Sequence, residues 1–435
     1  MTSSQISRRD LLRFSALGLG AFAIAGTAVA CASPTPGVGG PSGAPTPGEP
    51  TNFDFASWGM SEDATKGPLQ ASVNAFAKRD GIQIKTPSYP YNDYLSQLTL
   101  QVRGGQFTGA AQLDVAWLGG LVALGKLADL GSQAKGRGYT PAALGAGQFD
   151  GTQYALPWTI AAIGPVTNTE LWSKAGHSTP PVTIDEFEEA LRAIKGLGDG
   201  IIPYAASTKT AQLKDIIVWM QTFGSPIVED GKATIGDEGS VQAVEWYKKL
   251  FDDGLIAADI DRGAARTLFG QGKTAIYDDA PVGRAGVLKS ASYPDLAAKM
   301  GPIARPVLKK GDTPQEVLWG HLVVVVDGAG ADTAGEFAQW LTSDPAQQIS
   351  YFTALGLPPT TADALASSAV TGNTFVNDFT TRITVDAKPS PLWQYVQYAQ
   401  METAIAEQVQ AVLIGQSSAK DAMKTAGQQV QKLMG

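Results

Sequence analysis

The stretch LDVAWLGG, residues 113–120, decides the fold. Its first five residues have the composition of a short strand, and the pair Gly119-Gly120 marks the loop that follows. Residues 53–58, FDFASW, repeat this arrangement and run into Gly59. Each of the two predicted strands therefore ends in a tryptophan.

Strand and helix patterns alternate around these two stretches. The spacing of apolar residues predicts a helix over 68–79, a strand over 82–84 and a second helix over 94–102. This alternation indicates a parallel α/β layer, in which ligands bind beyond the carboxyl ends of the strands. Trp58 and Trp117 are therefore predicted to lie at a ligand-binding edge.

The rest of the chain continues this mixed pattern. Thr183 and Glu186, three residues apart, predict a capping box at the start of a helix. HLVVVV, residues 321–326, is apolar on both faces, which predicts a buried central strand. Further extended segments are predicted over 153–158, 163–168 and 273–278, and further helices over 217–223, 241–252 and most of 392–434, with a break at Gly415 and a restart at Ser418.

Composition limits the class of protein. The chain has 435 residues, which exceeds what one core usually organises, so two lobes are expected. Hydrophobic residues make up 44% and the formal net charge is −8. Residues 1–30 carry Arg8, Arg9 and Arg13 against Asp10, so the remainder carries −10. Nucleic acids and anionic lipids bind mainly through Lys and Arg, so an acidic surface excludes a nucleic-acid-binding function.

The first thirty residues have the layout of an export signal. Arg8-Arg9 precede an apolar run over 14–30, which ends in small residues before Cys31, the only cysteine. The arginine pair resembles a twin-arginine signal, and the small residues before Cys31 resemble a lipobox, in which the cysteine is lipidated. Ala28 departs from the leucine usual at that place. A transmembrane anchor is the alternative, but the run is short and weakly hydrophobic.

A tether is predicted between Cys31 and the folded body. Residues 31–51 are rich in Pro, Gly, Ser and Thr and almost without charge. With no second cysteine, no intramolecular disulfide can form. The sequence thus predicts a lipid anchor on Cys31 that holds a folded body at the extracellular face of the cell membrane.

Longer stretches carry a resemblance to a known family. DGTQYALPW (150–158), PVTNTELWSKAG (165–176) and PPVTIDEFEEALRAI (180–194) occur in the order typical of the solute-binding proteins of ABC importers. LFGQGKTAIYDD (268–279), WGHLVVVV (319–326) and the C-terminal helical region continue that order. The chain resembles most the carbohydrate-binding group related to maltose-binding protein. One departure concerns residues 166–168, where the family often has Tyr-Asn and only Asn168 is kept.

The resemblance implies a type II periplasmic-binding-protein fold. In such a fold two α/β lobes are joined by a hinge and enclose the ligand, and closure is favoured when the ligand contacts both lobes. The hinge crossings are expected near residues 159–164, 299–306 and 345–350. The predicted lobes, listed by residue number, are 52–160 with 305–346, and 161–304 with 347–435.

Aromatic platforms and hydrogen-bonding side chains are what a sugar site requires. Trp58, Trp117 and Trp158 lie at strand ends or at the first crossing, and Trp393 opens a late helix where the resemblance implies a stacking aromatic. The predicted ligand-binding residues are Trp58, Glu62, Asp63, Trp117, Trp158, Tyr277, Asp278, Asp279, Arg284, Trp319, His321 and Trp393. Packing in the core is the alternative for Trp58, Trp117 and Trp158, and a staple residue at a helix start is the alternative for Trp393. For 277–284 the alternative is a solvated turn, and for His321 it is a structural hydrogen bond. Trp172, Trp246 and Trp340 are expected in the core.

Other chemistries have less support in the sequence. The paired carboxylates Asp278 and Asp279 lack the further ligands of a calcium loop, and two histidines, His177 and His321, supply a metal site poorly. No cofactor, metal or catalytic role is therefore predicted. The predicted protein is a monomer that binds a carbohydrate and delivers it to the transmembrane permease of an ABC importer. A cell-surface glycoside hydrolase, with two carboxylates in its cleft, or an adhesion protein stays open as the alternative.

Overall fold

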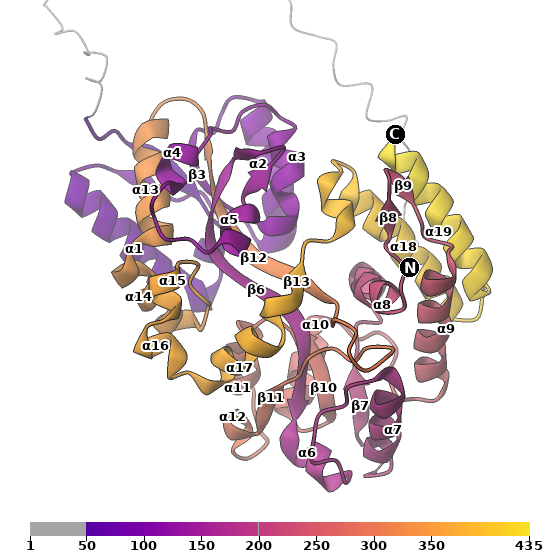
Figure 1. Cartoon of the computed structure of the whole chain (residues 1–435). Coiled ribbons are helices and arrows are strands. Elements are labelled where there is room, and N and C mark those ends of the chain that lie inside the picture. The colour runs from indigo at the N-terminus through magenta and orange to yellow at the C-terminus, as the bar shows by residue number, and fades with distance from the viewer. Residues whose placement is uncertain (1–48, 199) are drawn as a thin grey trace, which may run out of the picture. The chain divides into compact units, whose positions relative to one another are not determined.

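The computed structural model describes residues 49–198 and 200–435 (Figure 1). The predicted signal segment, Cys31 and the tether up to residue 48 lie outside the described residues. The described residues form one compact unit. No helix in the part of the chain that the structure describes has both the length and the apolar character that a membrane crossing needs.

A nine-stranded sheet runs through this unit. Seven strands follow the order β2-β1-β3-β12-β6-β10-β7, while β11 pairs with β6 and β13 with β12. The strands are β1 (Phe53–Ala56), β2 (Ile84–Lys85), β3 (Gly109–Asp114), β6 (Ala155–Asn168), β7 (Ile202–Ala205), β10 (Thr274–Asp279), β11 (Met300–Pro302), β12 (Glu316–Val326) and β13 (Ala387–Lys388). Two small hairpins, β4 (Gln148–Phe149) with β5 (Thr152–Gln153) and β8 (Val228–Glu229) with β9 (Lys232–Ala233), complete the strands.

The long strand β6 joins the two halves of the sheet (Figure 1). It pairs with β12 as far as Ile163 and with β10 from Gly164 to Thr167. The two extended pieces predicted around it are therefore one strand. At Gly164 an added Cβ would lie 2.4 Å from the side chain of Ile383, so glycine allows the close approach at this change of partner. The predicted lobe boundaries stay a prediction.

The sheet is mixed rather than parallel. β1 pairs in parallel with β2 and β3, and β10 with β7, as strand and helix alternation predicts. β12 instead runs antiparallel to both β3 and β6. The chain reaches β12 from the opposite half of the sheet and re-enters in the reverse direction, which local alternation does not encode.

β12 is the central buried strand that its apolar sequence predicts. Val323 and Val325 contribute to the core on one face, with Phe53 and Phe55 of β1. Leu322, Val324 and Val326 contribute to the core on the other face. Both faces are covered by helices, so a strand without polar alternation is stable here.

The two tryptophan strands end earlier than their sequences suggest. β1 ends at Ala56 and β3 at Asp114, and each is followed by a 3₁₀-helix, η2 (Trp58–Ser61) or η3 (Val115–Trp117). Ser57 and Asp114 cap these turns with their side-chain oxygens, which favours turning over continued pairing. Both tryptophans therefore follow the strands instead of ending them.

Helices cover the first half of the sheet. The predicted helices 68–79 and 94–102 lie inside the longer α1 and α2. The helices here are α1 (Asp63–Asp80), α2 (Tyr91–Arg103), α3 (Leu118–Val122), α4 (Gly131–Ala134), α5 (Pro141–Gly145), α13 (Ala331–Ser343), α14 (Pro345–Leu355) and α15 (Ala362–Leu365). The chain continues into α16 (Ser368–Thr371), α17 (Thr374–Arg382) and η5 (Thr384–Asp386), and Val370 and Phe379 pack there in one core with Tyr277 of β10 and Met300 of β11, so α16 and α17 cover the second half. The third predicted crossing, 345–350, forms the first half of α14.

The second half is enclosed by its own helices. They are α6 (Thr169–Lys174), α7 (Ile184–Lys195), η4 (Thr210–Asp215), α8 (Ile216–Thr222), α9 (Glu238–Asp252), α10 (Arg262–Gly270), α11 (Gly283–Lys289), α12 (Leu296–Lys299), η6 (Pro391–Gln394), α18 (Tyr398–Leu413) and α19 (Ala419–Met434). The predicted capping box at α7 is confirmed, as are the helical break at Gly415 and the Ser418 cap of α19.

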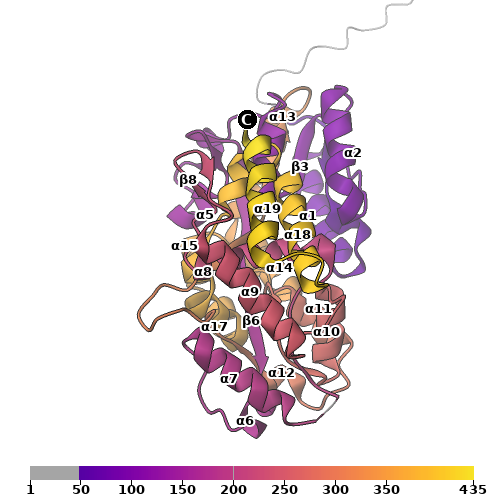
Figure 2. The ribbon, with the colours of Figure 1, turned by 90° about the vertical axis from the view of Figure 1, so that its right-hand side faces the viewer.

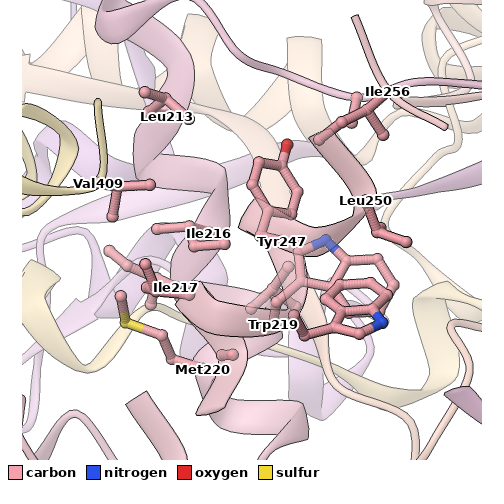
Figure 3. Packing of buried hydrophobic residues seen from close by; sticks show 14 of the residues in the cluster. Leu213, Ile216, Ile217, Trp219, Met220, Tyr247, Leu250, Ile256 and Val409 are labelled. Atoms are coloured by element: carbon pink, nitrogen blue, oxygen red, sulfur yellow. The ribbon is translucent and has the colours of Figure 1, made fainter. Parts of the chain in front are cut away.

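A large apolar core holds α8, α9, α18 and α19 together. Figure 2 shows α9 and α19 along one side of the molecule, and these two helices contact each other and α18. Figure 3 shows Trp219 of α8 close to Tyr247 and Leu250 of α9, while Met220 lies on the other side of α8 near Ile217. Trp172 and Trp246 lie in this core as expected, whereas Trp340 is partly buried in the core of the first half.

Candidate functional site

A cavity of about 570 Å³ receives side chains from both halves of the sheet. The first half contributes residues of α2 and of the segment after β3, and β12 contributes residues close to its start. The second half contributes η4, α8, the end of β10 and α18. The side chains used below are Tyr91, Asp114, Trp117, Tyr204, Lys214, Asp215, Trp219, Arg262, Asp278, Arg305, Trp319, Trp393 and Glu402.

Aromatic rings form part of the cavity wall. Trp117 lies 5.0 Å from the ring of Tyr91 and 5.5 Å from Trp58 behind it. Trp393, at the start of η6, is anchored because its indole Nε1 donates to Glu402 at 3.0 Å. Trp319 lies beside the same cavity on β12. Exposed indole faces of this kind pack on apolar C–H surfaces of a ligand.

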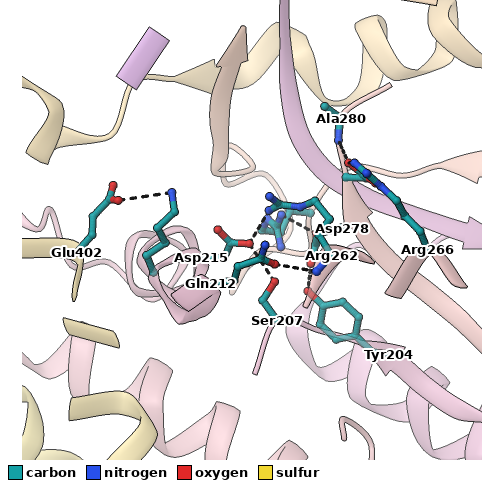
Figure 4. Close-up of polar contacts among 12 residues, drawn as sticks. Tyr204, Ser207, Gln212, Asp215, Arg262, Arg266, Asp278, Ala280 and Glu402 are labelled. Atoms are coloured by element: carbon teal, nitrogen blue, oxygen red, sulfur yellow. Dashed lines mark hydrogen bonds and ion pairs between the residues drawn. The ribbon is translucent and has the colours of Figure 1, made fainter. Parts of the chain in front are cut away.

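The three cations of the cavity wall each have a carboxylate partner. Arg262 Nη2 lies 2.6 Å from Asp215, and Arg305 Nη2 lies 2.9 Å from Asp278. Lys214 Nζ lies 3.5 Å from Glu402. Figure 4 shows this contact together with the ion pairs of Asp215 and Asp278. Charge-assisted pairs of this kind hold their side chains in fixed positions.

Asp114 is a fourth carboxylate in this wall. It accepts hydrogen bonds from the backbone N–H of Ala116 and from the Tyr91 hydroxyl, both at 3.0 Å. No cation lies within ion-pair distance of it among the described residues. Burial raises the pKa of Asp114, and the two hydrogen bonds oppose that rise.

Four of the twelve predicted ligand-binding residues line the cavity: Trp117, Asp278, Trp319 and Trp393. They come from four separate segments and lie around one space, although no sequence spacing relates them. Trp58 and His321 lie directly behind, because Trp58 contacts both Trp117 and the His321 ring. Neither is part of the cavity wall.

The other six predicted residues lie elsewhere. Trp158 is buried and stacks on Tyr351 at 4.6 Å, and Tyr277 is buried against Phe269. Asp279 pairs with Arg266 at 2.6 Å, outside the cavity wall. The remaining three, Glu62, Asp63 and Arg284, lie at the start of α1 or on α11, where Arg284 borders a separate groove.

Sequence reasoning missed most of the polar wall. Asp114 stands within the stretch that decides the fold, but its neighbours show only a strand. Trp219 and Lys214 fall in helical periodicity, where core packing is the ordinary interpretation. Arg262 and Arg305 stand in segments without a motif. Their partners are distant in sequence, so no local signal identifies them.

Comparison with known proteins places the chain in a family. Residues 71–376 match the model of the bacterial extracellular solute-binding proteins. A protein of Brucella abortus described as a binding protein is 28% identical over 230 residues, 50% of this chain and 56% of that protein. The diacetylchitobiose-binding protein DasA of Streptomyces coelicolor is 27% identical over 203 residues, 45% of this chain and 47% of that protein. The chain thus matches about half the length of these curated relatives.

Solved structures share the fold over nearly their whole length. The GacH receptor of Streptomyces glaucescens, studied without ligand and with acarbose, has a TM-score of 0.78 at 22% identity over 88% of this chain and 98% of the receptor. Maltose-bound MalE3 of T. maritima has a TM-score of 0.76 at 19% identity, with 88% and 100% covered. The two-lobed periplasmic-binding-protein fold is confirmed by these similarities.

Proposed function

The chain belongs to the bacterial extracellular solute-binding proteins, and from this membership we propose that it captures a carbohydrate in the cavity and delivers it to the permease of an ABC importer. The observation that carries the proposal is the cavity wall itself. It combines three tryptophans, Trp117, Trp319 and Trp393, with hydrogen-bonding side chains that ion pairs hold in place. Sugars present apolar C–H faces and hydroxyl rims, which match this combination.

The relatives support the ligand class. DasA is named for diacetylchitobiose, and the two structural neighbours were studied with acarbose and maltose. We propose a mono- or oligosaccharide for this chain. Trp117 and Trp393 act as stacking faces, and Asp114, Asp278 and Glu402 accept hydrogen bonds from sugar hydroxyls. A cavity of about 570 Å³ lies within the range of small-ligand sites.

Binding without chemical change is part of the proposal. A purified sample of residues 49–435 is titrated with maltose, acarbose, diacetylchitobiose and tagatose, and tryptophan fluorescence and thermal unfolding are followed. We expect saturable binding of at least one sugar, recovered intact by chromatography. Released reducing ends would instead support the hydrolase alternative. A wild-type protein that responds to no saccharide contradicts the proposed function and favours adhesion.

The lipid anchor is a separate proposal that rests on the sequence of residues 1–31. We infer that Cys31 carries a diacylglyceryl group after removal of the twin-arginine signal, so that the binding protein stays beside its permease. Mass spectrometry of the N-terminal peptide from membrane-extracted protein tests this, with Cys31→Ser as the control. A peptide that begins elsewhere, or that carries an unmodified cysteine, contradicts the anchor.

A further inference from the structure

Arg305 is the most deeply buried cation of the cavity wall. Its residue is 2% exposed, and it lies on the segment between β11 and β12, inside the predicted second crossing. Its guanidinium carbon lies 4.6 Å from the centre of a Trp219 ring, a cation–π contact that fixes its plane. An arginine held in this way does not move freely to find a partner.

Two carboxylates hold one edge of the guanidinium. Nε lies 3.3 Å from Glu316 Oε2, and Nη2 lies 2.9 Å from Asp278 Oδ1. The backbone N–H of Arg305 donates to the second oxygen of Glu316 at 2.8 Å, and the hydroxyl of Tyr204 donates to Asp278. Every donor and acceptor of this cluster is therefore engaged except one.

The exception is Nη1 of Arg305. It is buried, and no acceptor among the described residues lies within hydrogen-bond distance of it. A buried donor without a partner costs about 1–3 kcal/mol. Arg305 lines the cavity, so an oxygen of a bound ligand that reached Nη1 would remove this cost.

The charges around the cavity restrict the kind of oxygen. The cavity wall holds four carboxylates and three cations. The carboxylates are Asp114, Asp215, Asp278 and Glu402, and the cations are Lys214, Arg262 and Arg305. Each cation is already paired, and Glu316, which does not line the cavity, adds a second carboxyl group behind Arg305. Burial raises the pKa of Glu316 to about 8 although Arg305 opposes the rise, so Glu316 contributes its full negative charge above that pH. A carboxylate or sulfate group on the ligand would meet an excess of like charge, whereas a hydroxyl or carbonyl oxygen would not.

We propose that Arg305 is a ligand-binding residue that donates through Nη1 to an uncharged oxygen, and that Asp278 and Glu316 make the cavity select neutral over anionic saccharides. This inference rests on the proposed function, since it assumes that the cavity takes a sugar. It concerns the charge class of that sugar, which the family does not determine.

Glu316→Gln tests the charge balance without touching the cavity wall. The neutral probes are glucose, maltose and diacetylchitobiose, and the anionic probes are glucuronate, digalacturonate and inorganic sulfate. Each is titrated by calorimetry at constant ionic strength and at a pH above the raised pKa of Glu316, where its carboxylate is charged. Wild-type protein is expected to bind a neutral probe more tightly than every anionic probe, and the ratio of these two affinities is the quantity compared between variants. In E316Q the affinity for the anionic probes relative to the neutral probe is expected to rise about tenfold, because one carboxylate no longer offsets the charge of Arg305.

Asp279→Asn is the matched control. Asp279 neighbours Asp278 on β10 and is a buried partner of an arginine, Arg266, but neither lines the cavity. D279N should keep the wild-type ratio. Arg305→Lys removes Nη1 and should lower the affinity for the neutral probe about tenfold, whereas Arg266→Lys should leave that affinity unchanged. Asp278→Asn replaces E316Q if the latter fails to fold.

The outcomes separate this inference from the proposed function. Wild-type protein that binds glucuronate or sulfate as tightly as the neutral probes contradicts the inference, whichever sugar is transported. Folded E316Q and D278N without any gain for the anionic probes contradict it too. If no neutral saccharide binds wild-type protein, the proposed function fails. A gain of sulfate binding in E316Q would still support the inference that Glu316 offsets the charge of Arg305.

Discussion

Asp114 illustrates how single residues here serve fold and site together. Its carboxylate caps η3 by accepting from Ala116, which ends β3 and places Trp117 one turn further on. The same carboxylate accepts from Tyr91 and lines the cavity. A residue that begins a turn and faces a ligand is constrained by both tasks, and only its capping role follows from local sequence.

Removing the stacking tryptophans should weaken binding. We expect Trp117→Ala and Trp393→Ala each to weaken the binding free energy of the sugar with the highest affinity by more than about 1 kcal/mol, since each removes an aromatic anchor. Calorimetric titration measures the change. Trp340→Ala, a partly buried tryptophan away from the cavity, is the control and should change stability alone. Unchanged affinity in both cavity variants would show that the ligand binds elsewhere.

The buried histidine should make stability depend on pH. Burial lowers the pKa of His321 to about 3 from 6.5. Below about pH 6.5 the histidine is therefore protonated in the unfolded chain but stays neutral in the folded protein. The free energy of unfolding falls as the pH drops from about 6.5 toward 3. The loss amounts to about 1.4 kcal/mol per pH unit.

Urea unfolding at pH 7, 6, 5 and 4 measures this loss, and His321→Gln should remove it while the carboxylate contributions remain. Gln112 Nε2 lies 3.2 Å from Nδ1 of His321, so glutamine at 321 retains an acceptor for it. His177→Gln reports the contribution of the other histidine. Parallel curves for wild-type protein and H321Q would contradict the assignment.

At the scale of elements, the start of α7 shows a complete local signal. Thr183 accepts from the backbone N–H of Glu186 at 3.3 Å, and Glu186 accepts from that of Thr183 at 3.2 Å. Lys310 and the backbone N–H groups of Val182 and Thr183, which donate to the Glu186 carboxylate, lower the pKa of Glu186 to about 2. The apolar stripe of α7 then enters the core through Phe187, Leu191 and Ile194. All interactions of the cap lie within four residues of Thr183 except that of Lys310, so the helix start was predictable.

Thr183→Ala should destabilise the protein by about 1 kcal/mol, because the backbone N–H of Glu186 loses the Thr183 hydroxyl as its acceptor. Urea unfolding followed by circular dichroism measures the change in the free energy of unfolding. Thr183→Ser retains the hydroxyl and should restore most of the stability. Sugar affinity should stay at the wild-type value, since α7 does not line the cavity. Equal stability of T183A and wild-type protein would contradict the role of the cap.

The whole molecule depends on a few segments that run between the halves of the sheet. β6 exchanges β12 for β10 at Gly164, and Glu316, Arg305 and Asp278 join the start of β12 to β10 close to that point. The cavity lies between side chains of both halves, so a ligand that fills it contacts both at once. A ligand with this property stabilises the closed arrangement more than the open one.

Ligand binding should therefore stabilise and compact the molecule. At a free sugar concentration a hundredfold above Kd, the free energy of unfolding should rise by about 2.7 kcal/mol. Thermal unfolding measures this, and small-angle scattering should give a smaller radius of gyration with sugar than without. W117A and W393A should show both effects more weakly at the same sugar concentration, with the stabilisation reduced by about 1 kcal/mol, because each raises Kd. Stabilisation without compaction would show that binding does not close the lobes.

The sequence by itself determined the elements whose causes are local: the strand and helix alternation around 113–120, the apolar central strand β12, the capping box of α7 and the break at Gly415. The tertiary structure decided that β12 runs antiparallel to β3 and β6 and that Arg305 meets Asp278 and Glu316. It also decided which tryptophans face the cavity. Periodicity reports which side of an element is apolar, whereas pairing between distant segments depends on how the packed elements lie against one another.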